Sequence, residues 1–262
     1  MDPSKNNRAL IAAAKAGDLN EVAQIMAEGG DPLFDSSAAL RLAAENGHAE
    51  CVRLLASLSD PKAQDSKALL LAASNGHVEC VQLLMPLSDC KALNSSALGA
   101  AAANGQAECL KLLIPASDCM ADQSSALYWA ASFGHEECVK LLIPLSDCMA
   151  ENSRALASAA CGDYEYEECL KLLIPVSHPL LEIDRLLDMV FVEGNADIAI
   201  VQLLIDREPR LLDGLDLRRL LDVAIERENA EIAPYLLSLI DRRALGEGLA
   251  EAPARRKPRA RL

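Results

Sequence analysis

The stretch ALGAAAANGQAECLKLLIPASD, residues 97–118, contains the pattern that decides the fold of this chain. It is preceded by Asn94-Ser95-Ser96, side chains typical of the residues that cap the start of a helix. Apolar residues at helical spacing follow. Asn104-Gly105 then ends this first helix, because glycine suits the left-handed conformation beyond a helix C-terminus. A second helix is expected from about Gln106 to Pro115, since proline cannot continue a helix interior.

The same pattern recurs in five clear copies with a period of 29 residues. Each copy has a leucine, then an Ala-Ala pair, then a Glu-Cys-Val or Glu-Cys-Leu segment. A fixed period of about 20–50 residues is the signature of a solenoid, in which each unit rests on its neighbours. The sequence therefore predicts stacked helix pairs and an extended surface that binds other macromolecules. The recurring leucines are Leu40, Leu69, Leu98, Leu127 and Leu156.

Within one copy the string reads Ala39-Leu40, Ala43-Ala44, Gly47-His48, Val52 and Leu54-Leu55. This string resembles the ankyrin repeat. The resemblance implies an all-α fold, a right-handed-type α-solenoid of stacked helix-turn-helix repeats whose first helices line a concave face. The unit is shorter than the family's length of about 33 residues. Since the missing residues fall where ankyrin repeats carry a projecting β-hairpin, we expect these hairpins to be shortened or absent.

The flanking segments read as degenerate copies of the same unit. Clear repeats cover residues 36–176, and more polar capping repeats are expected at 4–32, 183–206 and 215–241, because terminal units keep an array soluble. The array would then span residues 1–243, followed by a basic and flexible tail at 244–262. An insertion, Asp163-Tyr164-Glu165-Tyr166, distinguishes the fifth copy. It could alter the curvature of the stack or form a binding feature.

The charge and cysteine content limit the partners and the compartment. The formal net charge is −14, and the basic residues of the tail leave the array more acidic still, so nucleic acid and anionic membranes are unfavourable partners. No apolar run reaches the roughly 18 residues that span a membrane, and we find no signal peptide. Nine cysteines are then expected to be reduced, buried thiols of a cytoplasmic, monomeric protein.

No catalytic or metal-binding constellation stands out. Three copies place a histidine three residues before a cysteine, as in His48 and Cys51, but a structural zinc ion takes four ligands. Gln106 replaces the histidine in a fourth copy. We therefore expect these histidines to satisfy backbone groups, and we expect no metal, cofactor, small-molecule substrate or enzymatic activity. Catalysis by a cysteine of the array is retained as an alternative, whereas His178 is expected to be a surface residue.

The positions that vary between copies predict the binding surface. Tyr128, Trp129 and Phe133 lie within six residues of one another in a chain with few aromatics. Trp129 and Phe133 are four positions apart, on one side of a helix, and Gly99-Ala100 leaves space beside them. Phe133 is expected to contact a partner, whereas Trp129 could do so or fill a core gap beside Gly99. The other predicted concave-face residues are Arg41, Glu45, Asn46, Ser74, Asn75 and Asn104.

These observations favour a scaffold that binds another protein through the concave face of the stack. An alternative is a bacterial effector that acts in a host cell, with the array as its targeting module and an active region from about Leu180. The short basic run Arg255–Arg261 could serve as a nuclear-localisation signal in that case, although a solvated chain end is the simpler interpretation.

Overall fold

The computed structural model describes residues 3–159, 167–177, 217–226 and 232–250. The chain forms two compact units, Met1–Glu182 and Ile183–Leu262. Regular structure in the described residues is entirely helical, with no β-strand among them, which confirms the predicted all-α class and the loss of the hairpins.

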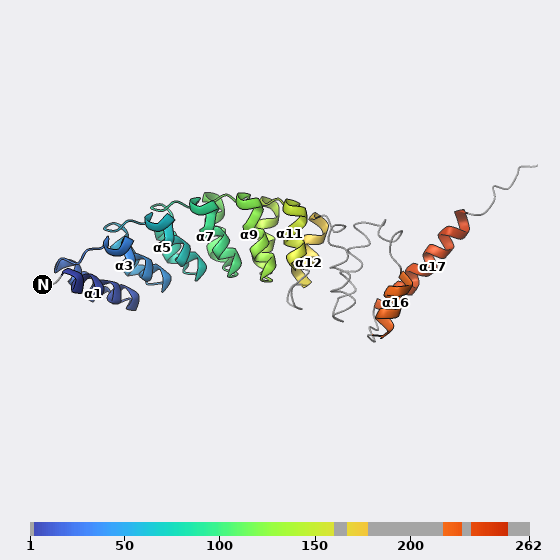
Figure 1. The fold of residues 1–262 in the computed structure, drawn as a ribbon, viewed down its shortest axis with the longest axis horizontal. Helices are drawn as coiled ribbons and strands as arrows, with labels where there is room; N and C mark the ends of the chain where they lie inside the picture. Colours follow the sequence, from blue (N-terminus) through green and yellow to red (C-terminus); the bar gives the residue numbers. More distant parts are fainter. Residues whose placement is uncertain (1–2, 160–166, 178–216, 227–231, 251–262) are drawn as a thin grey trace, which may run out of the picture. The chain divides into compact units, whose positions relative to one another are not determined.

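The first unit is a row of antiparallel helix pairs (Figure 1). The first helices of the pairs are α1 (Pro3–Ala16), α3 (Phe34–Glu45), α5 (Ala63–Ser74), α7 (Ala92–Ala103), α9 (Ala121–Ser132) and α11 (Ala150–Ala159). The second helices are α2 (Leu19–Ala27), α4 (Ala49–Ala56), α6 (Val78–Leu84), α8 (Ala107–Leu113), α10 (Glu136–Leu142) and α12 (Glu167–Leu173). Short 3-10 turns that contain proline follow the last three of these: Ile114–Ala116, Ile143–Leu145 and Ile174–Val176.

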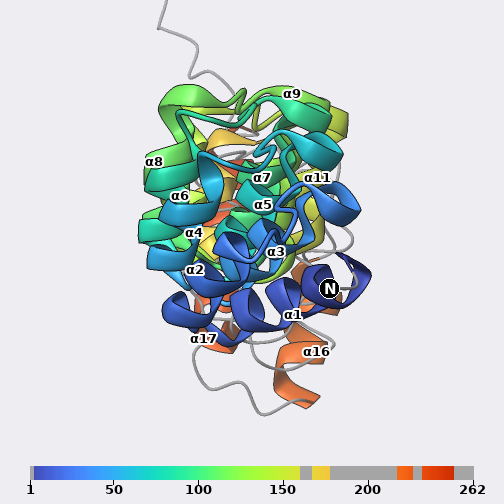
Figure 2. The ribbon, with the colours of Figure 1, turned by 90° about the vertical axis from the view of Figure 1, so that its left-hand side faces the viewer.

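The pairs stack so that each first helix packs on the next first helix, which gives two layers. Figure 2 looks along the row and separates α1, α3, α5 and α7 from α2, α4, α6 and α8. The recurring leucines, such as Leu69 and Leu98, are fully buried between the layers, as are the Ala-Ala pairs. Alanine side chains are small, so neighbouring first helices approach closely, and the predicted arrangement of stacked helix pairs is confirmed.

The Gly-His turn joins each pair to the preceding one. The Nε2 atoms of His48, His77 and His135 donate hydrogen bonds to backbone carbonyls 32 or 33 residues earlier, at 2.9 to 3.0 Å. Each ring lies directly against the glycine of the previous copy: a Cβ atom on Gly47 would be 2.5 Å from Nδ1 of His77. Gln106 occupies the same place beside Gly76. The histidines therefore satisfy backbone groups, as the sequence predicted.

A left-handed turn precedes the right-handed part of α3, α5, α7 and α9. In each, three consecutive non-glycine residues have positive φ, as in Leu93, Asn94 and Ser95 (φ 46°, 55° and 61°). This conformation costs about 1–2 kcal/mol per residue. The four left-handed turns are Asp35–Ser37, Gln64–Ser66, Leu93–Ser95 and Asp122–Ser124.

The last serine of each left-handed turn links two copies. Its hydroxyl is buried and accepts a hydrogen bond from the backbone N–H of an aspartate 23 residues later, as Ser95 does from Asp118 at 2.9 Å. The same bond joins Ser37 to Asp60, Ser66 to Asp89 and Ser124 to Asp147. The prediction that these serines cap their own helices was therefore wrong, since no side chain caps α7. The bonds offset part of the left-handed strain.

The second unit contains two described helices, α16 (Leu217–Glu226) and α17 (Ile232–Ala250), which pack on each other through Ala224, Ile232 and Leu236. Helix α17 includes residues 244–250, so this part of the expected flexible tail is helical instead. The predicted capping repeat at 183–206, the insertion at 163–166 and the basic run Arg255–Arg261 lie outside the described residues.

Candidate binding groove

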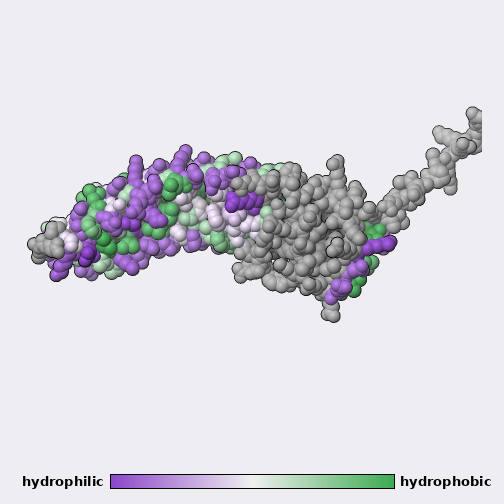
Figure 3. Space-filling view, viewed as in Figure 1, coloured by the Kyte–Doolittle hydropathy of each residue, from purple (hydrophilic) through white to green (hydrophobic). Residues whose placement is uncertain are grey.

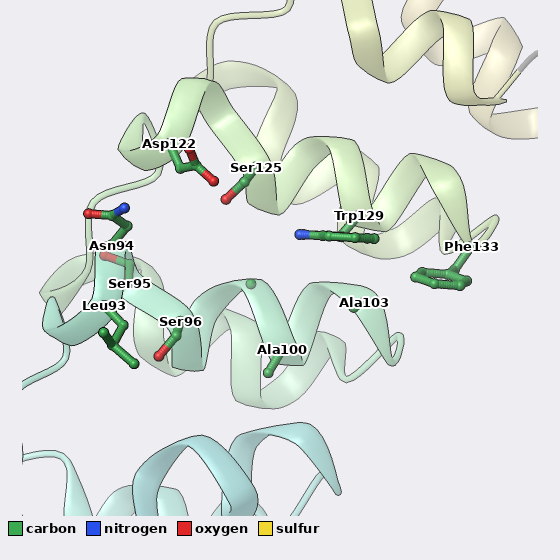
Figure 4. Close-up of a pocket in the computed structure, with 11 residues that line it drawn as sticks. Leu93, Asn94, Ser95, Ser96, Ala100, Ala103, Asp122, Ser125, Trp129 and Phe133 are labelled. Atoms are coloured by element: carbon green, nitrogen blue, oxygen red, sulfur yellow. The ribbon is translucent and has the colours of Figure 1, made fainter. Parts of the chain in front are cut away.

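A groove of about 380 Å³ lies between the neighbouring first helices α7 and α9. We call it the α7–α9 groove. Figure 4 shows small side chains from α7 on one side and Trp129 and Phe133 from α9 on the other, with Asp122 and Asn94 at one end. Its lining residues are Leu93, Asn94, Ser95, Ser96, Gly99, Ala100, Ala103, Asp122, Ser125, Trp129 and Phe133.

The groove exists because α7 carries small residues where α3, α5 and α9 carry large ones. Gly99 and Ala100 stand at the positions held by Leu70 and Leu71 in α5. A Cβ atom added to Gly99 would have no neighbour within 4 Å, so this glycine borders open space. The sequence analysis correctly expected space beside Gly99.

Trp129 and Phe133 form one wall of the groove. Their rings are stacked, with centroids 6.0 Å apart and an interplanar angle of 13°. Trp129 is 40% exposed and Phe133 is 50% exposed. Trp129 therefore does not fill a core gap: of the two interpretations of this residue, the core one is wrong. The rings of Tyr128 and Trp129 form a T-shaped contact, with their centroids 4.9 Å apart.

Tyr128 is held from the side of α11. The guanidinium carbon of Arg154 lies 3.9 Å from the centre of the Tyr128 ring, a cation–π contact. A hydrogen bond with Ser132 and the nearby Arg154 lower the pKa of the Tyr128 phenol, against the opposing effect of burial. Ser132 in turn bonds Ser158 of α11 at 2.5 Å. Tyr128 is thus a support for the aromatic wall and is only half-buried.

Arg41 lies on α3, in a different copy from the aromatic residues, and holds its own left-handed turn together. Its guanidinium donates to the backbone oxygens of Asp35 and Ser36 and to Oε1 of Gln64, at 2.8 to 3.2 Å, and lies 3.7 Å from the Asp35 carboxylate. The guanidinium N–H groups of Arg41 are therefore largely engaged in hydrogen bonds within the protein.

The predicted asparagines stabilise the C-terminal ends of the first helices. Asn46, Asn75 and Asn104 each donate a side-chain hydrogen bond to the carbonyl four residues earlier, at 2.8 to 2.9 Å. Asn104 also donates to Oγ of Ser74, and the carbonyl of Glu45 accepts from His77. Phe133 occupies the same repeat position with no polar side chain, so it departs from the framework.

Several groove residues escaped the sequence analysis. Leu93 is 64% exposed and stands where other copies have Asp35, Gln64 and Asp122. An apolar residue at an otherwise polar repeat position was a signal that could have identified it. Asp122 gave no such signal, since aspartate is ordinary at that position, and only the stacking of α9 on α7 brings it to the groove.

The cysteines within the described residues do not form a reactive site. Of the eight described, seven are buried and Cys119 is half-buried, and none is in a disulfide. Burial raises the pKa of the Cys80, Cys138 and Cys169 thiols to about 11, so the nucleophilic thiolate is scarce near neutral pH. Among the described residues no group of histidine, cysteine and carboxylate side chains could hold a metal ion.

Other exposed apolar side chains lie away from the groove. Leu58, Leu87 and Leu145 recur at the repeat period just after the second helices and are 43 to 46% exposed. On the face drawn in Figure 3, hydrophobic and hydrophilic residues of the first unit are intermixed. These leucines do not line the α7–α9 groove, so they provide controls of similar exposure for Trp129 and Phe133.

Comparison with known families agrees with this architecture. The profile of ankyrin repeats (three copies) matches residues 10–96, 42–123 and 98–185, which is most of the chain. The chain belongs to the ankyrin-repeat family. A search of curated proteins gives no match. Within the described residues, no helix combines the length and the apolar character that a membrane span requires.

Proposed function

We propose that this protein is a scaffold that binds another protein along its first helices, with the α7–α9 groove at the centre of the contact. Ankyrin repeats are in general protein-binding modules. The observation that carries the proposal is the stacked, exposed Trp129–Phe133 pair facing the small residues of α7. We further propose that the concave face of the stack is the side formed by the first helices.

The energetics favour this site over the rest of the row. Exposed aromatic side chains beside a pocket are typical binding hot spots, and truncation of one commonly costs about 2 kcal/mol or more of binding energy. The Trp129 ring is held by ring contacts with Phe133 and Tyr128, so little conformational entropy is lost when a partner covers it. Asn75 and Asn104 would contribute a polar rim, because their side chains are already held by hydrogen bonds to their own helices.

The proposal excludes a role for the array as an enzyme. Burial raises the pKa of the Cys138 thiol, so its nucleophilic thiolate is scarce, and the groove lining has serines and one carboxylate but no histidine, lysine or cysteine. We propose that the protein acts as a monomer, since nothing in the groove calls for a second copy.

The test is affinity capture with the intact chain, followed by mass spectrometry. The double variant Trp129→Ala/Phe133→Ala should lose specific partners, with affinity reduced roughly 30-fold or more, because both hot-spot rings are removed. The control variant Leu58→Ala/Leu87→Ala removes comparably exposed apolar side chains away from the groove. If both variants retain the same partners as the wild type, the groove is not the binding site.

A further inference from the structure

The α7–α9 groove has one charged lining residue, and it is an acid. Asp122 lies at the end of the groove, and Figure 4 shows its carboxylate beside Ser125 and Asn94. Among the described residues, no side chain forms a hydrogen bond or an ion pair with this carboxylate, whereas the equivalent Asp35 is paired with Arg41. Asp122 is therefore available to a cation from outside.

The surrounding charge has the same sign. Residues 1–182 contain 24 aspartates and glutamates but 12 lysines and arginines. Arg154 does not line the groove, and its guanidinium lies over the Tyr128 ring. A cationic partner segment would therefore be attracted to the groove both by the array as a whole and by Asp122 locally.

The opposite end of the groove is apolar. Trp129 and Phe133 offer stacked rings there, facing Ala100 and Ala103 across the groove. Such a surface takes an aliphatic or aromatic side chain, and the small residues of α7 leave the depth that it needs. The groove thus changes along its length from an acid to an apolar wall.

Chain geometry relates these two ends to a recognition pattern. Asp122 and Trp129 are seven residues apart in α9, which is about 10 Å at the rise of a helix. In an extended segment, side chains two positions apart point to the same side and lie about 6–7 Å from each other. The long side chain of an arginine or lysine spans the remaining distance. The amide of Asn94 and the hydroxyl of Ser125 lie at the Asp122 end and can bond the backbone of such a segment.

Resting on the proposed function, we propose that the α7–α9 groove binds an extended partner segment with an arginine or lysine at the Asp122 end and an apolar side chain, two positions away, against Trp129 and Phe133. The partner is therefore a protein with a cation–x–apolar sequence in an exposed extended stretch. A partner that presented an acidic residue at the first position would be repelled by Asp122.

The test uses an array of acetylated and amidated hexapeptides with the intact protein. One position carries arginine, its neutral isostere citrulline, or glutamate, and the position two residues later carries leucine or serine. Wild type should bind the arginine–x–leucine peptides about three- to fivefold more tightly than the citrulline peptides, the range of an exposed ion pair. The glutamate peptides should bind weakest.

Two variants separate the ends of the groove. Asp122→Asn should remove the preference for arginine over citrulline and keep the preference for leucine over serine. Asp65→Asn is the matched control, because it removes the same charge from an exposed residue of the α5 left-handed turn. Trp129→Ala/Phe133→Ala should remove the leucine preference.

Three outcomes overturn the inference: equal binding of arginine and citrulline peptides by wild type, an Asp65→Asn effect as large as that of Asp122→Asn, or no peptide bound by wild type. Each leaves the proposed function intact if the Trp129→Ala/Phe133→Ala variant still loses its protein partners in the capture experiment. If one of these outcomes occurs and the Trp129→Ala/Phe133→Ala variant also keeps its protein partners, both proposals are wrong.

Discussion

Two sets of positions in the same helices behave in opposite ways. Framework positions repeat in most or all of the clear copies and are buried or bonded between copies, as Leu98, Ser95 and His77 are. Groove positions vary, and in α9 they replace framework residues: Phe133 stands where Asn46 and Asn75 bond their own helices. The comparison indicates that stability is spread evenly along the row, whereas the candidate binding chemistry is concentrated at one pair of helices.

The largest expected effect separates the two sets by stability. Leu98→Ala should lower the free energy of unfolding by about 3 kcal/mol, because this side chain is fully buried and leaves a cavity. Trp129→Ala should cost less than about 1 kcal/mol, because the ring is 40% exposed. Urea denaturation followed by circular dichroism measures both. Equal losses would mean that Trp129 belongs to the core after all.

A second comparison concerns two glycines. Gly47→Ala should destabilise the protein by about 2 kcal/mol, because φ is +76° and the new methyl group would collide with the His77 ring. Gly99→Ala should instead stabilise α7 by up to about 1 kcal/mol, since the site is helical and open. Thermal unfolding of the two variants checks this. A destabilising Gly99→Ala would contradict the open groove.

The serines before α7 give a smaller, paired effect. Ser95→Ala should cost about 1–2 kcal/mol, because the backbone N–H of Asp118 loses its acceptor, the buried Ser95 hydroxyl. The neighbouring Ser96→Ala should change stability by less than about 0.5 kcal/mol, since its hydroxyl makes only a long bond of 3.4 Å within its own helix. Urea midpoints of the two variants decide whether the Ser95 link between copies is structural. If Ser96→Ala lowers stability more than Ser95→Ala does, the Ser95 hydrogen bond does not stabilise the stack of copies.

The most gradual effect is on pH dependence. The folded pKa of Cys80, Cys138 and Cys169 is about 11, above the ordinary thiol value of 9.0. Above about pH 9 the unfolded state therefore binds fewer protons than the folded state, and stability falls until about pH 11. A Cys80→Ala/Cys138→Ala/Cys169→Ala variant should show a shallower fall of the urea midpoint between these pH values. An identical slope in both proteins would show that these thiols do not ionise on unfolding.

The sequence alone predicted most of the framework. The period, the Gly-His turn and the Ala-Ala pairs set the helix pairs, because local capping and one-turn apolar spacing are enough to define each unit. It also identified Trp129, Phe133 and the space at Gly99. It did not predict that three residues such as Leu93–Ser95 form a left-handed turn, because polar residues before a helix ordinarily predict a cap.

The sequence did not predict which residues from different copies contact one another. Asp122 and Leu93 are ordinary surface residues within their own repeats and meet at the groove only because α9 stacks on α7. Arg41 and Asn104 were predicted as contact residues from their variability or position, and their hydrogen bonds inside the protein became evident only in three dimensions.

The most direct test uses the fact that Trp129 is the single tryptophan of the chain, so its fluorescence reports on the groove alone. On titration with the best-bound arginine–x–leucine peptide, Trp129 emission should shift to shorter wavelength and become less accessible to acrylamide. Both changes should follow the saturation curve of peptide binding. Saturation of the peptide with Trp129 emission and quenching unchanged would contradict the assignment of the α7–α9 groove as the binding site.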